Sequence, residues 1–194
     1  ISPFSSWGAT NELTLKPDIT AIGGSVVSAY KNGSIAISSG TSMASPAIAG
    51  ISVLVRQYLK STTNLGGREL AAAVDKLMMS SASPVTDTDS GLPFSPRVQG
   101  AGLVDAGKAV SVGAYINVAG TDKSKFELGD DRARTGCYTM TFDVVNITNE
   151  TKVYNLSVSA LTESAVCGRV NPDHTYEYLM EQFEYELESN IDAP

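Results

Sequence analysis

Apolar side chains recur every three or four residues along the stretch that follows Gly40-Thr41-Ser42. The recurring positions are Met43, Ala47, Ile48, Ile51, Leu54, Val55, Tyr58 and Leu59. This spacing predicts an α-helix with one buried face. Pro46 lies near its start, where a missing N–H is best tolerated. A second helix is predicted over 68–79 and a short one over 104–110, with a loop rich in Ser, Pro, Asp and Gly over 80–102.

Two short apolar runs, 26–30 and 34–38, flank Lys31-Asn32-Gly33 upstream of the first helix. Because an Asn-Gly pair accepts positive φ at both central positions of a turn, this segment predicts a β-hairpin. Strand-like and helix-like segments therefore alternate up to about residue 115. That alternation is typical of an α/β domain.

The pattern changes in the second part of the chain. Residues 138–145 and 152–158 alternate between apolar and polar positions, and the turn-rich segment 146–151 connects them. This spacing is typical of a β-sandwich. We therefore predict two domains, over residues 1–115 and 116–194.

Charge supports the same division. The 194 residues carry 14 basic and 21 acidic side chains, for a net charge of −7. Residues 1–115 hold 8 basic and 7 acidic side chains, whereas residues 116–194 hold 6 and 14. An acidic chain is poorly suited to bind nucleic acid or an anionic membrane surface. No apolar run approaches the ~18–20 residues of a transmembrane helix, so no membrane span is expected.

No signal peptide opens the chain, and it begins at Ile1 rather than at methionine. We take this start to indicate a processed or excised piece. The hydrophobic content of 42% is sufficient for a buried core.

Ser42 is the strongest candidate for chemistry. A serine at the start of a buried helix lies where unpaired backbone N–H groups and the positive end of the helix dipole converge. Its own N–H is placed to stabilise an oxyanion formed in acyl transfer. Gly40 allows another backbone to approach closely. The alternative is that Thr41 or Ser42 only caps the helix.

The neighbouring sequence favours the chemical interpretation. The segment Gly40-Thr41-Ser42-Met43-Ala44-Ser45-Pro46-Ala47-Ile48-Ala49-Gly50 closely resembles the nucleophile segment of subtilisin-like serine proteases, the subtilases. Phe4-Ser5-Ser6-Trp7-Gly8 and Lys16-Pro17-Asp18-Ile19 resemble the family's approach to that segment. The segment from Ser95 to Asp105, Ser-Pro-Arg-Val-Gln-Gly-Ala-Gly-Leu-Val-Asp, resembles the closing segment of the cell-envelope branch, which includes the lactocepins and the streptococcal C5a peptidases.

This resemblance implies a fold and a set of roles. Residues 1–115 would be the C-terminal portion of a subtilisin-like parallel-sheet α/β domain, and the β-rich part would be an all-β, fibronectin-III-like sandwich. Ser42 would be the nucleophile and its N–H one half of the oxyanion hole, with Gly40 and Thr41 positioning a protein or peptide substrate. Two departures are Ala21-Ile22-Gly23, where the family usually has Ala-Pro-Gly, and Ala47-Ile48 in place of the frequent His-Val.

The rest of the triad is missing. In subtilases the aspartate, the histidine and the oxyanion asparagine precede the serine, yet no histidine lies among the 41 residues before Ser42. His174 is the chain's single histidine and is expected to be a surface residue in the acidic half. We therefore expect an N-terminal portion, on a separate chain or in a section absent here, to supply the missing groups. The location would be secreted or bacterial cell-surface.

The alternative function is a catalytically inactive subtilase-like scaffold that binds a partner or regulates one. An adhesive β-sandwich protein would explain only the second part of the chain. No cofactor is required for acyl transfer, although Asp87, Asp89 and Asp105 suggest calcium because the family often binds it. The alternative for these aspartates is ordinary turns.

Two features of the second part stay open at this level. Cys137 and Cys167 form a disulfide in one interpretation and remain free thiols in the other. The apolar residues of 170–194 recur at helical spacing, which suggests an amphipathic helix, and the alternatives are a later segment or a solvated tail.

Overall fold

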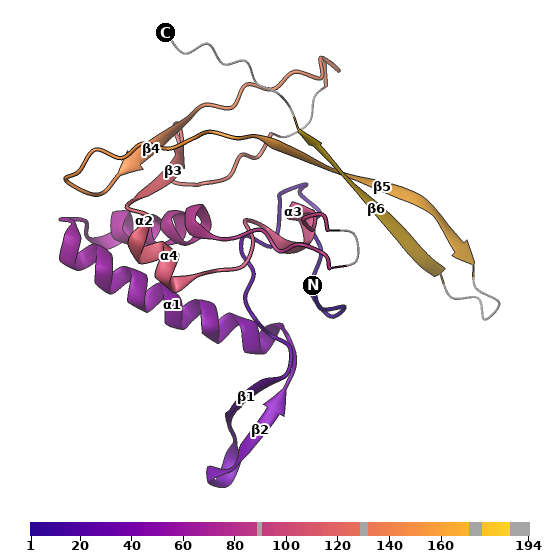
Figure 1. The fold of residues 1–194 in the computed structure, drawn as a ribbon, viewed down its shortest axis with the longest axis horizontal. Coiled ribbons are helices and arrows are strands. Elements are labelled where there is room, and N and C mark those ends of the chain that lie inside the picture. The colour runs from indigo at the N-terminus through magenta and orange to yellow at the C-terminus, as the bar shows by residue number, and fades with distance from the viewer. Residues whose placement is uncertain (89–90, 129–131, 171–175, 187–194) are drawn as a thin grey trace.

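The computed structural model describes residues 1–88, 91–128, 132–170 and 176–186. Two helices form its centre, the 22-residue α1 (Thr41–Thr62) and α2 (Gly67–Ser81), and the short helix α4 (Ala106–Ser111) packs against both. The three predicted helices are therefore confirmed (Figure 1). A further short helix, α3 (Pro96–Gln99), lies inside the segment predicted as a loop.

The core lies between α1, α2, α4 and the strand that follows α4. Its fully buried side chains include Val55 and Leu59 of α1 and Leu70 and Leu77 of α2. Burying a side chain of this size stabilises a fold by about 1.5–3 kcal/mol. The core therefore fixes the C-terminal half of α1, whereas the N-terminal half of this helix has no fully buried residue.

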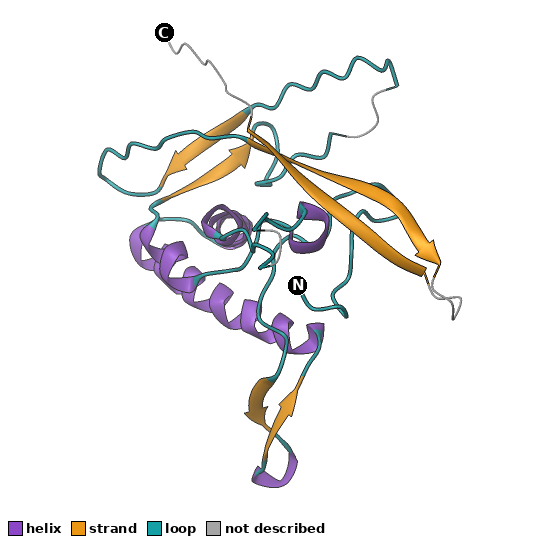
Figure 2. Ribbon diagram, turned by 45° about the vertical axis from the view of Figure 1, so that its right-hand side comes forward, coloured by secondary structure: helices purple, strands orange, loops and turns teal. Residues whose placement is uncertain are grey.

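The predicted hairpin is confirmed. Strand β1 (Val26–Ala29) pairs antiparallel with β2 (Ile35–Ser38), and the turn η1 (Lys31–Gly33) joins them. Asn32 and Gly33 have φ of 57° and 72°, as the Asn-Gly turn requires. The hairpin projects away from the helices and leads directly into α1 (Figure 1, Figure 2).

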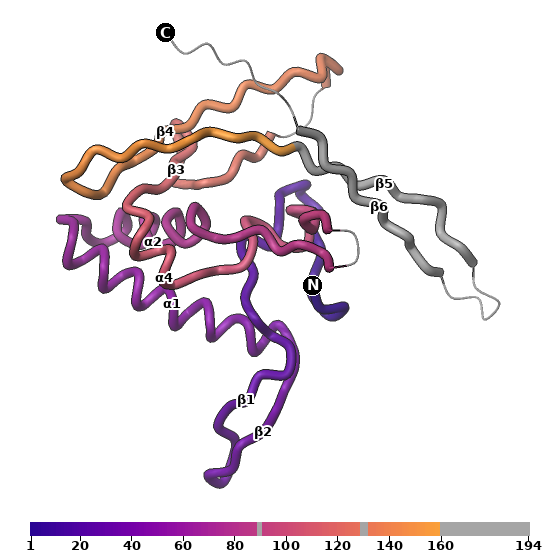
Figure 3. Tube along the Cα trace, in the orientation of Figure 1, coloured from indigo at the N-terminus to yellow at the C-terminus, as the bar shows by residue number. Residues whose placement is uncertain are grey.

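The expected parallel sheet is not present in the described part of the chain. The three pairs of named strands are all antiparallel and two-stranded, and a single parallel bridge joins Thr20 to Leu103. A parallel sheet needs several strands connected by crossovers. Before α1, the segment 18–24 makes only this bridge, and residues 26–38 form the hairpin. The path from this segment through the hairpin into α1 can be followed in Figure 3.

The second part of the chain forms small antiparallel ribbons. Strand β3 (Ala114–Val118) pairs with β4 (Phe142–Asn146), which partly confirms the predicted strand over 138–145. Strand β5 (Ser159–Val170) pairs with β6 (Tyr176–Glu186). The described residues of 116–194 do not make up a complete sandwich, and the fibronectin-III-like domain stays a prediction.

One local prediction in this part was wrong, and one of the alternatives left open for residues 170–194 is excluded over the described residues. No strand forms over 152–158. Alternation of apolar and polar residues predicts a strand only where another part of the protein covers the apolar face. Such a cover is missing at Val153, which is 89% exposed. The amphipathic helix considered within 170–194 is replaced by β6 over the described residues. Short apolar runs are ambiguous between helix and strand, and the tyrosines of this run favour a strand.

The core continues past residue 115. Tyr115 belongs to it, and Val145 and Ile147 of the β4 region pack against it. Lys76 of α2 is 8% exposed, and its Nζ donates to Asn117 Oδ1 at 2.9 Å and lies 5.2 Å from the centroid of the Tyr115 ring. The β3–β4 ribbon is therefore attached to the helices, and the predicted division into two domains stays a prediction.

Candidate active site

Ser42 is the second residue of α1, and its side chain is exposed. Gly40 is the N-cap residue, with φ 155° and ψ 163°, a backbone conformation that is essentially restricted to glycine. The first N–H groups of a helix have no partner within the helix. Among the described residues, the Ser42 N–H has no hydrogen-bond acceptor. The donor of the predicted oxyanion hole is therefore free to bind a ligand.

Two backbone hydrogen bonds hold the turn before Ser42. The Gly40 N–H donates to the Gly23 carbonyl at 2.8 Å, and the Met43 N–H donates to the Gly40 carbonyl at 3.0 Å. The first bond ties the start of α1 to the extended segment 18–24. The second begins the helix. The conformation of Gly40 is thus fixed from both sides.

A groove of about 560 Å³ lies between segment 18–24 and the start of α1. Gly40 and Thr41 line it, and so do Ala44, Ser45 and Ile48, further along α1. None of the side chains that line the groove in the described part of the chain is titratable. No described side chain of the groove can therefore act as the base that accepts the Ser42 hydroxyl proton.

Neither Asp87 nor Asp105, the two other candidate residues that the structure describes, lines this groove. His174 and Asp89 lie outside the described residues. Asp105 caps α4, accepting from the Lys108 N–H at 2.9 Å, and Asp87 lies in the loop before α3. No group of three potential metal ligands occurs among the described residues. The calcium expectation remains untested.

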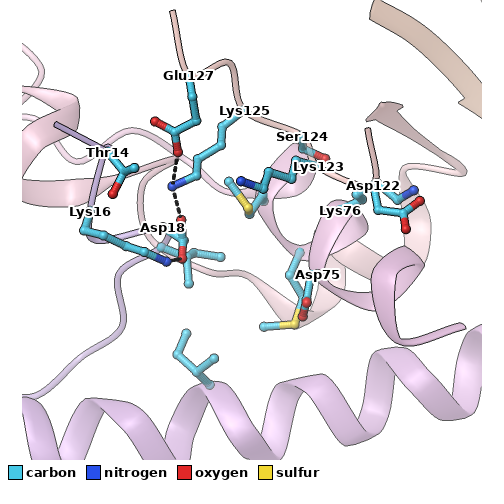
Figure 4. Close-up of a pocket in the computed structure, with 14 residues that line it drawn as sticks. Thr14, Lys16, Asp18, Asp75, Lys76, Asp122, Lys123, Ser124, Lys125 and Glu127 are labelled. Carbon is cyan, nitrogen blue, oxygen red and sulfur yellow. Dashed lines mark hydrogen bonds and ion pairs between the residues drawn. The ribbon is translucent and has the colours of Figure 1, made fainter. Parts of the chain in front are cut away.

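A charged cluster lies apart from Ser42, in a cavity of about 400 Å³ between segment 14–18, α2 and residues 122–127 (Figure 4). Lys125 Nζ contacts Asp18 Oδ1 at 2.7 Å and Glu127 Oε1 at 3.0 Å, and Lys16 also pairs with Asp18. Sequence analysis missed this cluster because its members are far apart in the chain and unremarkable in type.

The pKa values within the cluster follow from these contacts. Burial alone would raise the pKa of Asp18, but hydrogen bonds and charges from Lys125 and Lys16 outweigh it, and the pKa lies below its ordinary value. The pKa of Glu127 is lowered in the same way by Lys125, and that of Lys125 is raised by both carboxylates. Burial, aided by the charge of Asp18, raises the pKa of nearby Asp75. The ionised forms of the three paired groups therefore stabilise one another.

An exposed serine with a free N–H at the start of a long helix, preceded by a glycine-specific turn, defines a candidate nucleophile site of the acyl-transfer type. Residues 1–102 match the model of the subtilase family. The chain belongs to this family.

Comparison with curated proteins gives two groups of relatives. The chain is similar to a C5a peptidase from Streptococcus pyogenes, with 40% identity over 131 residues, which cover 67% of this chain. It is also similar to a PI-type and a PII-type proteinase from Lactococcus lactis subsp. cremoris, with 31% identity over 208 residues, which cover all of this chain. The matched regions span only 11% of the length of each relative.

Two further findings bear on expectations from the sequence. Cys137 is an exposed free cysteine in the structure. Within the described ranges, no helix is long and apolar enough to cross a membrane.

Proposed function

We propose that this chain carries the nucleophile of a subtilisin-like serine endopeptidase that cleaves protein or peptide substrates. The observation that supports this proposal most directly is the exposed Ser42 at the start of α1, whose N–H has no acceptor among the described residues, in a chain of the subtilase family. The aspartate, the histidine and the oxyanion asparagine come from an N-terminal portion outside this chain. No cofactor is needed.

The proposed reaction proceeds through an acyl-enzyme. Ser42 Oγ attacks the scissile carbonyl carbon while the histidine accepts the hydroxyl proton. The resulting oxyanion accepts a hydrogen bond from the Ser42 N–H and one from the asparagine. The histidine then protonates the leaving amine, and water hydrolyses the acyl-enzyme by the same steps. Gly40 and Thr41 hold the substrate backbone beside the nucleophile.

The open edge of segment 18–24 supports a missing N-terminal portion. On one side, the Thr20 N–H donates to the Gly102 carbonyl at 2.9 Å, and the Thr20 carbonyl accepts from the Val104 N–H at 2.9 Å. The neighbouring residues Ile19 and Ala21 direct their backbone groups to the other side, as successive residues of a strand do. Among the described residues these groups have no hydrogen-bond partner. An unpaired edge of this kind fits a further parallel strand.

Exposed apolar side chains support the same conclusion. On the hairpin, Val27 pairs with Ile37 and Ala29 with Ile35, so these side chains share one face. Val27, Ile35 and Ile37 are 63%, 74% and 69% exposed. Val53 and Leu54 of α1 are also more than half exposed. A chain that leaves such surfaces uncovered is expected to bury them against another part of the protein.

The remaining assignments rest on the resemblance and on the relatives. We propose that residues 116–194 form a fibronectin-III-like support for the protease portion, and that the protein is secreted or attached to a bacterial cell surface. The named relatives are a C5a peptidase and lactococcal proteinases. The alternative is a catalytically inactive scaffold that binds a partner.

A fluorophosphonate probe tests the proposal, because it labels only an activated serine. The probe is applied to this chain alone, to the chain together with the N-terminal portion, and to the variants Ser42→Ala and Ser45→Ala of that combination. We expect labelling only when the N-terminal portion is present, and its loss in Ser42→Ala but not in Ser45→Ala. Peptide hydrolysis by Ser42→Ala should fall by several orders of magnitude. Absence of labelling in the combination would favour the inactive scaffold.

A further inference from the structure

Gly23 lies against the turn that presents Ser42. It is buried, and its carbonyl accepts the 2.8 Å hydrogen bond from the Gly40 N–H. A Cβ placed on Gly23 would lie 2.6 Å from the Gly40 carbonyl oxygen and 3.2 Å from Ala44 Cβ. An ordinary contact begins at 3.4 Å, so a methyl group at this position would displace the Gly40 carbonyl by about 0.8 Å.

The obstacle at Gly23 is space and not backbone conformation. Gly23 has no positive φ, so φ at this position does not itself require glycine. Its neighbour Gly24 has the same property, but a Cβ there would meet only Ser2 Oγ, at 3.7 Å. The two adjacent glycines therefore differ in their surroundings: Gly23 is buried against the start of α1, whereas Gly24 is exposed.

The Gly40 carbonyl oxygen, the atom that would be displaced, takes part in the first turn of α1. The Gly40 carbonyl oxygen accepts the first hydrogen bond of α1, from the Met43 N–H at 3.0 Å, and this bond spans Thr41 and Ser42. A shift of this carbonyl therefore turns the peptide planes on which the Ser42 N–H and side chain depend. The buried half of α1 at Val55 and Leu59 cannot follow, because it is fixed in the core.

We propose that Gly23 is a positioning residue for Ser42. Because Gly23 has no side chain, the Gly40 carbonyl can pack against segment 18–24, and this contact determines the orientation of the Ser42 hydroxyl and of the Ser42 N–H. The inference rests on the proposed peptidase function. According to this inference, the orientation of Ser42 depends in part on a segment about 20 residues before it in the chain.

The test measures labelling of Ser42 over time in the protein that includes the N-terminal portion. The probe is a fluorophosphonate, and the variants are Gly23→Ala and the matched control Gly24→Ala. For Gly23→Ala we expect the rate constant of labelling to fall about 10²-fold, with the same final fraction of labelled chains, because a displacement near 1 Å costs about this factor. For Gly24→Ala we expect a change of less than about threefold. In peptide hydrolysis, kcat of Gly23→Ala should fall while KM stays within about twofold.

Each outcome has a distinct meaning. If the unmodified protein is not labelled, the proposed function fails and the role of Gly23 fails with it. If it is labelled and both variants react at its rate, the proposed function stands and the positioning role is refuted. If Gly23→Ala reduces only the final fraction of labelled chains and leaves the rate constant unchanged, the residue serves folding alone, and the positioning role is again refuted.

Discussion

The charged cluster around Lys125 provides a sharp test of what joins the segment 122–127 to the helical body. Lys125 Nζ contacts Asp18 Oδ1 at 2.7 Å, Glu127 Oε1 at 3.0 Å and the Leu15 carbonyl at 2.5 Å. Its side chain is only 14% exposed. Lys125→Met keeps an unbranched apolar stem of four heavy atoms but removes the ammonium group and all three contacts. Asp18 then keeps its ion pair with Lys16, and Glu127 loses its ion pair with Lys125.

The expected cost lies between two known limits. An exposed ion pair contributes about 0.2–1 kcal/mol, whereas removal of one partner from a buried pair costs about 3–5 kcal/mol. The side chains of Asp18 and Glu127 are 35% and 27% exposed, so water screens the carboxylates that remain. We therefore expect Lys125→Met to lower the free energy of unfolding by about 1–2 kcal/mol at neutral pH.

The effect should depend on pH in a predictable direction. The pKa values of Asp18 and Glu127 are depressed in the folded protein, so their contribution is present above the ordinary values of 3.8 and 4.5 and is lost as the pH falls through the folded values. The pKa of Lys125 is raised, so its contribution is present below 10.5 and is lost as the pH rises through the folded value. The difference in the free energy of unfolding between Lys125→Met and the unmodified protein should therefore be constant between pH 4.5 and pH 10.5 and should become smaller at lower and at higher pH.

Urea unfolding followed by circular dichroism measures this difference at pH 3 and pH 7. Lys152→Met is the matched control, because Lys152 pairs with Glu150 at 3.2 Å and Glu150 is 79% exposed. The control should change the free energy of unfolding by no more than about 0.5 kcal/mol. Equal effects of the two substitutions at pH 7, or an effect of Lys125→Met that is the same at both pH values, would refute the reasoning.

Two further predictions concern packing and the free thiol. Leu77→Ala should lower the free energy of unfolding by about 2–5 kcal/mol in the same urea experiment, because Leu77 is fully buried. The control Leu54→Ala, at a position that is 53% exposed, should lower it by less than about 1 kcal/mol. Equal effects of the two substitutions would contradict the described core. Cys137 should react with a thiol reagent such as DTNB in the native protein, because it is exposed and free, and Cys137→Ser should lower the reaction by one thiol per chain. Protection that only a reductant relieves would instead indicate the disulfide.

The elements with strong local signals were predicted well. The spacing from Met43 to Leu59 and the Asn32-Gly33 turn specify α1 and the hairpin, because periodicity and turn chemistry act within a few residues. Prediction failed over 152–158, where alternation had no covering partner, and it left alternatives open for β6, where a short apolar run fits either period. In both places the outcome depends on what lies beside the segment, which a local pattern does not contain.

The sequence by itself determined the family, the helix that carries Ser42 in its first turn and the absence of a histidine among the 41 residues before Ser42, since each is a property of residue types in a fixed order. Only the tertiary structure decided which residues surround that serine. Gly23 meets the Gly40 carbonyl, and Lys125 meets Asp18, across long stretches of chain. Such contacts arise when the core packs, because packing brings together positions whose spacing along the chain carries no information about their distance in space.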